Sequence, residues 1–263
     1  MKITVIGAGN IGGAIVEGAV KQGFLTAADI VVSDPHPNVR ERFSSRNIAV
    51  NHVNNNAVAV EDADLVIVAV KPWLVEVVMG EISGAINRDR QAIVSIAAGV
   101  AFAQIRQYLS VADRGEAEIY RIIPNTAISL GKSVSFIAKH NTSAKHDEQV
   151  DALFKALGEV FYVEEGEMTA CTALSSAGIA YALRYIDAAM RGGEALGLDR
   201  DKSLQIVMKT VESALALLET NNTNPQTEID KVTTPGGVTL KGLDKMENGG
   251  FSQSVIDGLL ATK

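Results

Sequence analysis

Residues 2–12 read KITVIGAGNIG, and the order of patterns within this segment indicates the architecture of the N-terminal half of the chain. Its first part, Lys2–Ile6, is rich in β-branched residues and predicts a strand. The glycines after this strand have the spacing G-x-G-x-x-G, and the small-residue stretch Ile11–Gln22 after them predicts a helix. A strand, a glycine-rich turn and a helix in this order are typical of a dinucleotide-binding fold.

Each glycine of this turn is expected to have a different physical role. Gly7 permits a tight turn, Gly9 lets a pyrophosphate approach the backbone without meeting a Cβ, and Gly12 lets the helix lie close to the strand. Free N–H groups at the start of the helix complete an anion site. The alternative to a dinucleotide site is a glycine-rich turn between strand and helix that binds no ligand. The expected cofactor contacts are Gly7, Ala8, Gly9, Asn10, Ile11 and Gly12.

Strand and helix patterns continue to alternate as far as residue 163. Further strands are predicted at Ile30–Ser33, Asp64–Val70, Ala92–Ile96, Glu118–Ile123, Ser133–Ala138 and Val160–Val163. Helices are predicted between them at Pro37–Arg46, Leu74–Ile86, Phe102–Leu109 and Ala144–Leu157. Because such alternation builds βαβ units, we expect an α/β domain with a Rossmann-type, mostly parallel sheet over residues 1–163.

The character of the chain changes after Glu164, where strand patterns stop. Met168–Leu196 consists largely of Ala, Leu and small residues, and Asp199–Glu219 predicts a second long helix with Asp199 as its N-cap. A last helix is predicted from about Ser252. We expect residues 164–263 to form an all-helical domain, and its long apolar helices need a partner surface, which predicts a homodimer.

Composition restricts the classes of function. The 263 residues are 47% hydrophobic but only 5% aromatic, so we expect a core built mainly from Ala, Val, Ile and Leu, as in buried parallel sheets. The net charge of -7 argues against a nucleic-acid partner. The single cysteine, Cys171, is consistent with a reducing compartment. No apolar run reaches the length of a membrane span and no leader precedes the first strand, so a cytoplasmic protein is expected.

The end of the second predicted strand is expected to meet the adenosine ribose of a dinucleotide. Asp34 would accept hydrogen bonds from the ribose hydroxyls, favouring NADH, and would repel the 2′-phosphate of NADPH. If Asp34 turned away, a phosphate would find possible partners in Ser33, His36, Asn38 and Arg40. Asp34 is equally open to interpretation as a turn residue before Pro35. The choice between NADPH and NADH therefore stays open.

Further segments complete a pattern known from one family. AVKP (Ala69–Pro72), SIAAGV (Ser95–Val100) and RIIPNT (Arg121–Thr126) each end a predicted strand. VTTPGGVTLKGL (Val232–Leu243) lies in the helical half and is followed by Gly249-Gly250-Phe251. In order and spacing, along essentially the whole chain, these segments resemble the pyrroline-5-carboxylate reductases. The TPGG segment is the most specific of them, whereas the glycine loop and AVKP occur more widely.

The resemblance implies an NAD(P)H-dependent oxidoreductase of proline biosynthesis, which reduces the C=N bond of a small imine, 1-pyrroline-5-carboxylate, to L-proline. It adds as cofactor positions Ser33, Asp34, Asn56, Ala69, Val70, Lys71, Pro72 and Ala97. It implies as substrate and catalytic positions Asn125, Thr234, Gly236, Gly237 and Thr239. In this assignment Thr234 and consecutive backbone N–H groups hold the carboxylate, and Thr239 lies near the imine nitrogen. It also implies dimers that assemble into rings.

Three departures from the family pattern leave the exact imine open. Ile179 stands where the family usually has proline in GSGPAY, Ala127 stands at the proline after N-T, and Val238 replaces a threonine. The alternatives are a non-catalytic dinucleotide-sensing regulator or a related imine reductase. A β-hydroxyacid dehydrogenase is disfavoured because residues 172–198 contain no lysine. A deazaflavin-dependent NADP reductase is disfavoured because such enzymes are shorter and lack the TPGG segment.

The histidines suggest no rival chemistry. The sequence around His36, His52, His140 and His146 is polar, and all four are expected to be solvated. No spacing of His, Cys and Asp indicates a metal site.

Overall fold

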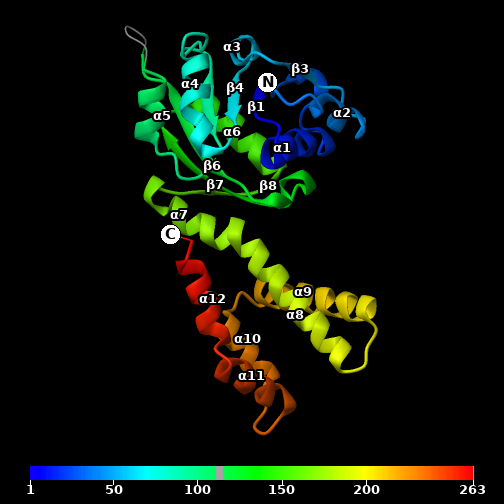
Figure 1. Ribbon diagram of the computed structural model, residues 1–263. Coiled ribbons are helices and arrows are strands. Elements are labelled where there is room, and N and C mark those ends of the chain that lie inside the picture. Colours follow the sequence, from blue (N-terminus) through cyan, green and yellow to red (C-terminus); the bar gives the residue numbers. More distant parts are fainter. Residues whose placement is uncertain (111–114, 263) are drawn as a thin grey trace. The chain divides into compact units, whose positions relative to one another are not determined.

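In the computed structural model, residues 1–110 and 115–262 are described, and the chain divides into two compact units, Met1–Ser176 and Ala177–Lys263 (Figure 1). The predicted boundary at residues 163/164 lies directly after the last strand. The helical segment that comes next, as far as Ser176, belongs to the first unit.

The first unit is built on one sheet, whose strands have the order β3-β2-β1-β4-β5-β6-β7-β8. Their bounds are β1 (Ile3–Ile6), β2 (Ile30–Ser33), β3 (Asn51–Val53), β4 (Leu65–Val68), β5 (Ala92–Ser95), β6 (Glu118–Ile123), β7 (Ser133–His140) and β8 (Gly158–Tyr162). Every neighbouring pair is parallel except β6 and β7. The predicted Rossmann-type, mostly parallel sheet is confirmed.

The register of the central strands brings their carboxyl ends to one edge. Ile6 pairs with Ser33 on one side and with Val68 on the other, and Val68 pairs in turn with Ser95. The strand order reverses between β1 and β4. In open α/β sheets, ligands bind outside the carboxyl ends of the strands at this switch point.

Helices and apolar clusters cover both faces of the sheet. The helices of this unit are α1 (Asn10–Lys21), α2 (Val39–Ser44), α3 (Asn56–Ala59), α4 (Val75–Ser83), α5 (Phe102–Tyr108), α6 (Ala144–Ala156) and α7 (Met168–Cys171), with short 3₁₀ turns η1 (Ala27–Asp29), η2 (Pro72–Leu74), η3 (Thr126–Leu130) and η4 (Glu165–Glu167). In β4, Leu65 and Ile67 join the cluster under α1 and α6, whereas Val66 and Val68 join the one under α4 and α5. Because both faces are buried, the strand is an unbroken apolar run.

Several elements differ from their predicted extent. The helix predicted at Pro37–Arg46 is limited to Val39–Ser44, and the strand predicted to reach Val70 ends at Val68. The strand Asn51–Val53 and the helix Pro225–Val232 were not among the predicted segments. Both are short and largely polar, so neither carries a clear hydrophobic period.

The second unit is helical, as predicted. Its helices are α8 (Gly178–Ala195), α9 (Arg200–Asn221), α10 (Pro225–Val232), α11 (Val238–Asn248) and α12 (Phe251–Leu260); a π-helical turn, Thr172–Ala177, lies at the division between the units. The predicted cap is confirmed, because the Asp199 carboxylate accepts hydrogen bonds from the N–H groups of Asp201 and Lys202 at 2.9 and 3.0 Å. Among the described residues, no helix combines the length and the apolar character needed to cross a bilayer.

Candidate functional site

A cavity of about 800 Å³ lies at the carboxyl edge of the sheet. It is bounded by the segments after β1, β2, β4 and β5, together with one side of α4. Of the predicted cofactor positions, it is lined by Gly7, Gly9, Asn10, Ile11, Ser33, Asp34, Asn56, Ala69, Val70, Lys71, Pro72 and Ala97. The two others, Ala8 and Gly12, are buried and do not line it. The fold thus brings together residues from five separate stretches of sequence.

The glycine turn after β1 leaves no space for side chains at two of its positions. Gly7 has a φ of +91°, and a Cβ there would come within 2.9 Å of the Ala69 carbonyl oxygen. A Cβ on Gly12 would lie 1.9 Å from the Gly7 carbonyl oxygen, so α1 begins in direct contact with the turn. A Cβ on Gly9, by contrast, would meet nothing within 4 Å. Gly9 therefore borders open space, which suits the approach of a phosphate.

The N-terminus of α1 offers unused hydrogen-bond donors to this cavity. Its N-cap residue is Gly9, and no side chain caps the helix. Among the described residues, the N–H groups of Gly9 and Asn10 have no partner, and both residues line the cavity. Free N–H groups at a helix N-terminus form a ready anion site, because the helix dipole adds positive charge there.

Asp34 lies at the end of β2 with its carboxylate held on both oxygens. Its Oδ2 accepts the N–H of Ala8 at 2.7 Å and its Oδ1 accepts the N–H of His36 at 2.8 Å. The side chain of His52 lies 2.9 Å from the Asp34 carbonyl oxygen. An ionised carboxylate has about four acceptor positions. Asp34 can therefore hold the glycine turn and still accept further hydrogen bonds from a ligand.

A chain of polar contacts closes the same corner of the cavity. The Ser33 hydroxyl donates to the Asn56 Oδ1 at 2.7 Å, and the Asn56 amide donates to the Glu81 carboxylate at 2.5 Å. Asn55 caps α3 by accepting the N–H of Val58, so Asn56 begins that helix beside the end of β2. Two carboxylates, those of Asp34 and Glu81, therefore border this corner and give it a negative charge.

The opposite wall is mostly apolar and lies after β4 and β5. Val70 and Pro72 form it together with Ala97, which is 5% exposed. Lys71 is exposed, and it is the only lysine or arginine among the described residues that line the cavity. The sequence interpretation missed several wall residues: Leu74, Val77, Val78 and Glu81 of η2 and α4, and Ile96 and Ala98 after β5. The spacing of Leu74, Val77, Val78 and Glu81, typical of one helix face, was the available signal.

Asn125 is buried and does not line this cavity, and its amide nitrogen and oxygen each have a protein partner. Its Oδ1 accepts the N–H of Ala127 at 3.1 Å, and its Nδ2 donates to the Ser175 hydroxyl, also at 3.1 Å. A proline at position 127 would lack the N–H that Asn125 accepts. The departure at Ala127 therefore supplies one of the contacts that orient this side chain.

In the second unit, the segment Thr234–Gly237 forms a turn before α11. The Gly237 N–H donates to the Thr234 carbonyl at 2.9 Å, and Gly236 has a φ of +73°, a conformation that favours glycine. Thr234 and Thr239 are exposed, and no side chain caps α11. The first N–H groups of this helix are therefore free to bind an anion such as a carboxylate.

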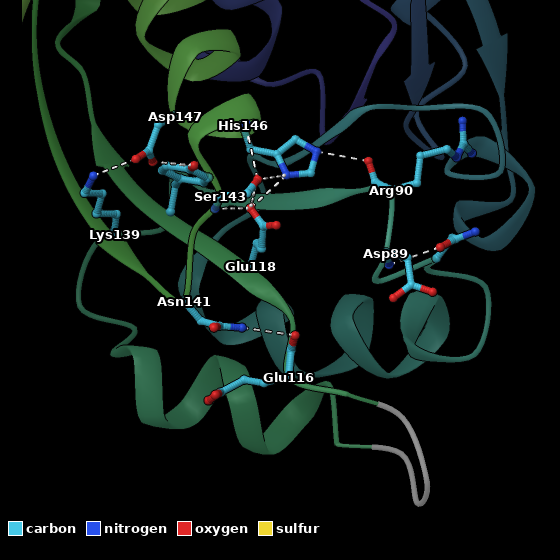
Figure 2. A network of polar contacts seen from close by, with 11 residues as sticks. Asp89, Arg90, Glu116, Glu118, Lys139, Asn141, Ser143, His146 and Asp147 are labelled. Carbon is cyan, nitrogen blue, oxygen red and sulfur yellow. Dashed lines mark hydrogen bonds and ion pairs between the residues drawn. The ribbon is translucent and has the colours of Figure 1, made fainter.

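The prediction that all four histidines are solvated is wrong for His146. This residue is 2% exposed, with Nδ1 lying 2.8 Å from a Glu118 carboxylate oxygen and Nε2 lying 3.0 Å from the Arg90 carbonyl oxygen (Figure 2). His146 shares the inner face of α6 with Val150 and Leu153, a helical spacing that the polar neighbours in sequence concealed. The network lies at the amino ends of β5 and β6, opposite the cavity.

The same network includes a second buried group. The Tyr120 hydroxyl donates to the Asp147 carboxylate at 2.8 Å. The same carboxylate accepts a hydrogen bond from Lys139 at 2.7 Å (Figure 2). Burial, with the hydrogen bond to Asp147, raises the pKa of the Tyr120 phenol. Tyr120 therefore stays protonated and serves as a structural donor.

Two family models match separate parts of the chain, and curated relatives match nearly all of it. Residues 165–263 match the family model described as pyrroline-5-carboxylate reductase dimerisation. Residues 2–99 match the model described as NADP oxidoreductase, coenzyme F420-dependent. The pyrroline-5-carboxylate reductase of Glycine max is 31% identical over 97% of this chain and 91% of its own length.

Solved structures show the same fold over the full chain. Pyrroline carboxylate reductase of Plasmodium falciparum, solved with NADP bound, superposes with a TM-score of 0.90 at 22% identity and covers 100% of this chain and 95% of its own. The 1-pyrroline-5-carboxylate reductase of Streptococcus pyogenes has a TM-score of 0.86 at 27% identity and covers 100% of this chain and 96% of its own.

Proposed function

The chain belongs to the pyrroline-5-carboxylate reductase family, and on this basis we propose that it reduces the C=N bond of 1-pyrroline-5-carboxylate to give L-proline, with NADPH or NADH as the reductant. The observation that carries the proposal is the cavity at the carboxyl edge, with its uncapped glycine turn, in a chain similar to these reductases along its whole length.

The cavity suits a nicotinamide dinucleotide. Its volume of about 800 Å³ lies within the range of cofactor sites, and its features occur in the order that the coenzyme requires. The free N–H groups of Gly9 and Asn10 would hold the pyrophosphate, and Asp34 with the Ser33–Asn56 pair would hold the adenosine ribose. When bound, the dihydronicotinamide supplies the hydride that reduces the imine carbon.

The apolar wall formed by Val70, Pro72 and Ala97 would orient the nicotinamide ring. Side chains on this wall offer the ring no competing hydrogen bonds and exclude water from the reacting face. Lys71 stands at the edge of this wall and adds a positive charge, which favours binding of an anionic substrate.

The substrate carries a carboxylate and a ring nitrogen, and the turn before α11 offers groups for both. Thr234 and the backbone of Gly236 and Gly237 would hold the carboxylate, because the uncapped helix N-terminus attracts negative charge. Thr239 would donate a hydrogen bond to the imine nitrogen. The proton that completes the product comes from this hydroxyl or from solvent, so no histidine is needed.

Asn125 keeps both of its amide groups on protein partners. It therefore acts as a positioning residue, which orients the turn after β6 and the π-helical turn through Ser175. A contact of Asn125 with the substrate, which the family resemblance implies, stays a prediction.

Thr239 can be tested directly. Thr239→Ala removes the proposed donor and should lower kcat by about tenfold or more, the range for losing a hydrogen bond to a group that gains charge. Thr239→Ser keeps the hydroxyl and should retain most of the activity. Unchanged turnover of the alanine variant would remove Thr239 from the mechanism.

The reaction is tested by the loss of absorbance at 340 nm when NADH or NADPH is mixed with 1-pyrroline-5-carboxylate. Rapid oxidation of either coenzyme, with proline as the product, is the expected result. Coenzyme binding without oxidation would exclude this substrate, and it would favour a related imine or a dinucleotide-sensing regulator.

We also propose that the enzyme is a homo-oligomer in which dimers assemble into a ring, and that it acts in the cytoplasm. The match of residues 165–263 to a dimerisation family supports the dimer, and the family resemblance supports the ring. The low cysteine count is consistent with a reducing compartment. Light scattering on the purified enzyme measures the assembly, and fractionation of the source cells tests the location.

A further inference from the structure

The glycine turn is held from behind by an arginine of α2. Arg42 Nη1 lies 2.8 Å from the carbonyl oxygen of Ala8 and 3.1 Å from that of Gly9. Its Nη2 lies 3.3 Å from Glu17 Oε1 on α1, and Arg46 contacts the same oxygen. Glu17 is only 5% exposed, so this carboxylate is committed to the two arginines. Arg42 thus joins α2 to both α1 and the turn.

The absence of a side chain at Gly13 makes room for this contact. A Cβ on Gly13 would lie 2.6 Å from Arg42 Nη2 and 2.7 Å from its Cζ, which is closer than real Cβ atoms approach. Gly13 is not one of the glycines of the G-x-G-x-x-G pattern, and its φ is not positive. Its role here is to let the guanidinium lie against α1.

The contacts of Arg42 help to determine where two N–H groups point. The Ala8 carbonyl and the Gly9 N–H belong to one peptide plane, and the Gly9 carbonyl and the Asn10 N–H belong to the next. In a planar trans peptide the C=O and N–H point in opposite directions. Arg42 holds the Ala8 carbonyl, and it shares the Gly9 carbonyl with the N–H of Gly13, which donates to it at 2.9 Å. Both carbonyls thus lie on one side, and the N–H groups of Gly9 and Asn10 point to the other side, where both residues line the cavity.

Asp34 fixes the preceding peptide in the same manner. It accepts the Ala8 N–H at 2.7 Å, so three consecutive peptide planes are oriented by charged side chains that come from outside the turn. A glycine-rich segment without such contacts samples many conformations, and ordering it would cost free energy on binding.

We propose that Arg42, seated by Glu17 and Gly13, is a positioning residue that sets coenzyme affinity by holding the Gly9 and Asn10 N–H groups toward the pyrophosphate. The inference rests on the proposed function in one respect, namely that the ligand is a dinucleotide. Arg42 acts through the backbone and not by contact with the substrate, so it should change coenzyme binding and leave the chemical step intact.

Binding of NADH to the full-length protein can be followed without any imine. The protein has a single tryptophan, Trp73, directly after Pro72, so energy transfer from this residue to bound NADH reports the complex. Arg42→Met should raise the Kd for NADH and the KM for coenzyme about tenfold, while kcat at saturating coenzyme stays within about twofold of wild type. Arg42→Lys keeps one charged donor and should recover part of the affinity.

Arg46→Met is the matched control for charge. Arg46 contacts Glu17 but neither Ala8 nor Gly9, so its loss removes the same charge without freeing the turn. It should change the Kd less than threefold. An equal loss of affinity in Arg46→Met and Arg42→Met would overturn the proposal, because the effect would then come from charge or stability alone. An unchanged Kd in Arg42→Met would overturn it as well.

Gly13→Ala offers a second route to the same contact. Alanine favours the helix over glycine, so the change does not weaken α1 itself, but its Cβ displaces the guanidinium. We expect a rise in Kd of about threefold in the wild-type background and no further rise when Arg42 is already Met. Effects that multiply in the double variant would contradict the proposal.

The failure of this inference is distinguishable from the failure of the proposed function. A wild-type protein that binds neither NADH nor NADPH would refute the proposed function. A wild-type protein that binds coenzyme only as well as its Arg42→Met variant does would refute only the role of Arg42.

Discussion

At the scale of single residues, the chemistry of the ribose corner depends on which partners a carboxylate already has. Asp34 accepts hydrogen bonds from Ala8 and His36, so it helps to hold the turn whether or not a coenzyme is bound. Glu81 adds a second carboxylate to the corner, through its hydrogen bond from Asn56. A 2′-phosphate would meet both negative charges, and from this repulsion we predict that the corner binds NADH more readily than NADPH.

Asp34→Asn separates the charge of this residue from its shape. The amide oxygen can still accept the Ala8 N–H, whereas the amide NH2 group takes the place of the oxygen that accepts the His36 N–H, so that one hydrogen bond is lost. The repulsion of a 2′-phosphate is reduced. We expect the ratio of kcat/KM for NADPH to that for NADH to rise about tenfold, which corresponds to about 1.4 kcal/mol. Steady-state rates with both coenzymes measure this ratio, and Asp62→Asn, at an exposed carboxylate, is the control. An equal fall for both coenzymes would mean that Asp34 acts only through the turn.

At the scale of elements, the first turn of α1 packs directly against the main chain of the glycine turn, at Gly12 and Gly7. The Gly12 position has no room for a methyl group, because the Gly7 carbonyl oxygen would lie 1.9 Å from its Cβ. The oxygen belongs to the main chain, so it cannot rotate away as the end of a side chain would. Glycine is therefore required there by packing.

A pair of glycine substitutions tests this requirement. Gly12→Ala should lower the free energy of unfolding by about 1–3 kcal/mol or more, because α1 must move away from β1. Gly80→Ala in α4 is the control, since a Cβ there meets nothing within 4 Å; it should stabilise the protein by about 0.5–1 kcal/mol. Urea unfolding measures both. A Gly12→Ala variant as stable as wild type would show that the turn adapts.

The buried network on α6 is expected to contribute to stability and not to catalysis. His146 connects α6 to β6 through Glu118 and to the segment before β5 through the Arg90 carbonyl. Glutamine cannot reach both the Glu118 carboxylate and the Arg90 carbonyl as the imidazole does, so buried polar groups lose a hydrogen bond. This should lower the free energy of unfolding by about 1–3 kcal/mol. We expect a lower melting temperature and an unchanged KM for coenzyme. The neighbouring exposed change Lys145→Gln should alter neither, and a raised KM in His146→Gln would connect this network to the cavity.

At the scale of the whole molecule, the two units differ in how much of their apolar surface is buried. In the first unit the strands β1, β4 and β5 are buried along their full length. In the second unit, among residues 177–262, the buried side chains are those of Met190 and Ser203. Large apolar side chains such as Leu183 and Leu215 are 59% and 57% exposed. A helical unit with so little core of its own needs a partner.

The same substitution in the two units tests where that partner binds. Leu215→Glu in α9 should shift the protein toward a smaller species in sedimentation or light scattering, because a buried charge opposes association. Leu130→Glu is the control: Leu130 is 67% exposed but lies in the first unit. A protein whose mass is unchanged by Leu215→Glu would place the interface elsewhere than around this residue.

The nature and order of the main elements depend on local patterns. The glycine turn, the apolar strands and the Asp199 cap were all predictable, because each depends on neighbours within a few residues along the chain. Motif spacing identified the residues of the glycine turn that border the cavity. The other predicted positions that border it, Ser33, Asp34, Asn56, Ala69–Pro72 and Ala97, were implied by the family resemblance. The strand Asn51–Val53 was not predictable, since it is polar and is defined by its pairing with β2.

Tertiary structure alone decided the burial of His146 and the contacts of Arg42. The sequence showed His146 among polar neighbours, but the packing of α6 buries it against Glu118, which is 28 residues away. Arg42 was not singled out, because its partners Ala8, Gly9 and Glu17 become neighbours only when α2 packs against α1. Local propensity acts between residues that are close in sequence, whereas burial and hydrogen bonding act between residues that the fold brings together. The sequence therefore determined the sheet, the dinucleotide motif and the helical second half, and the packing determined which side chains hold that motif in shape.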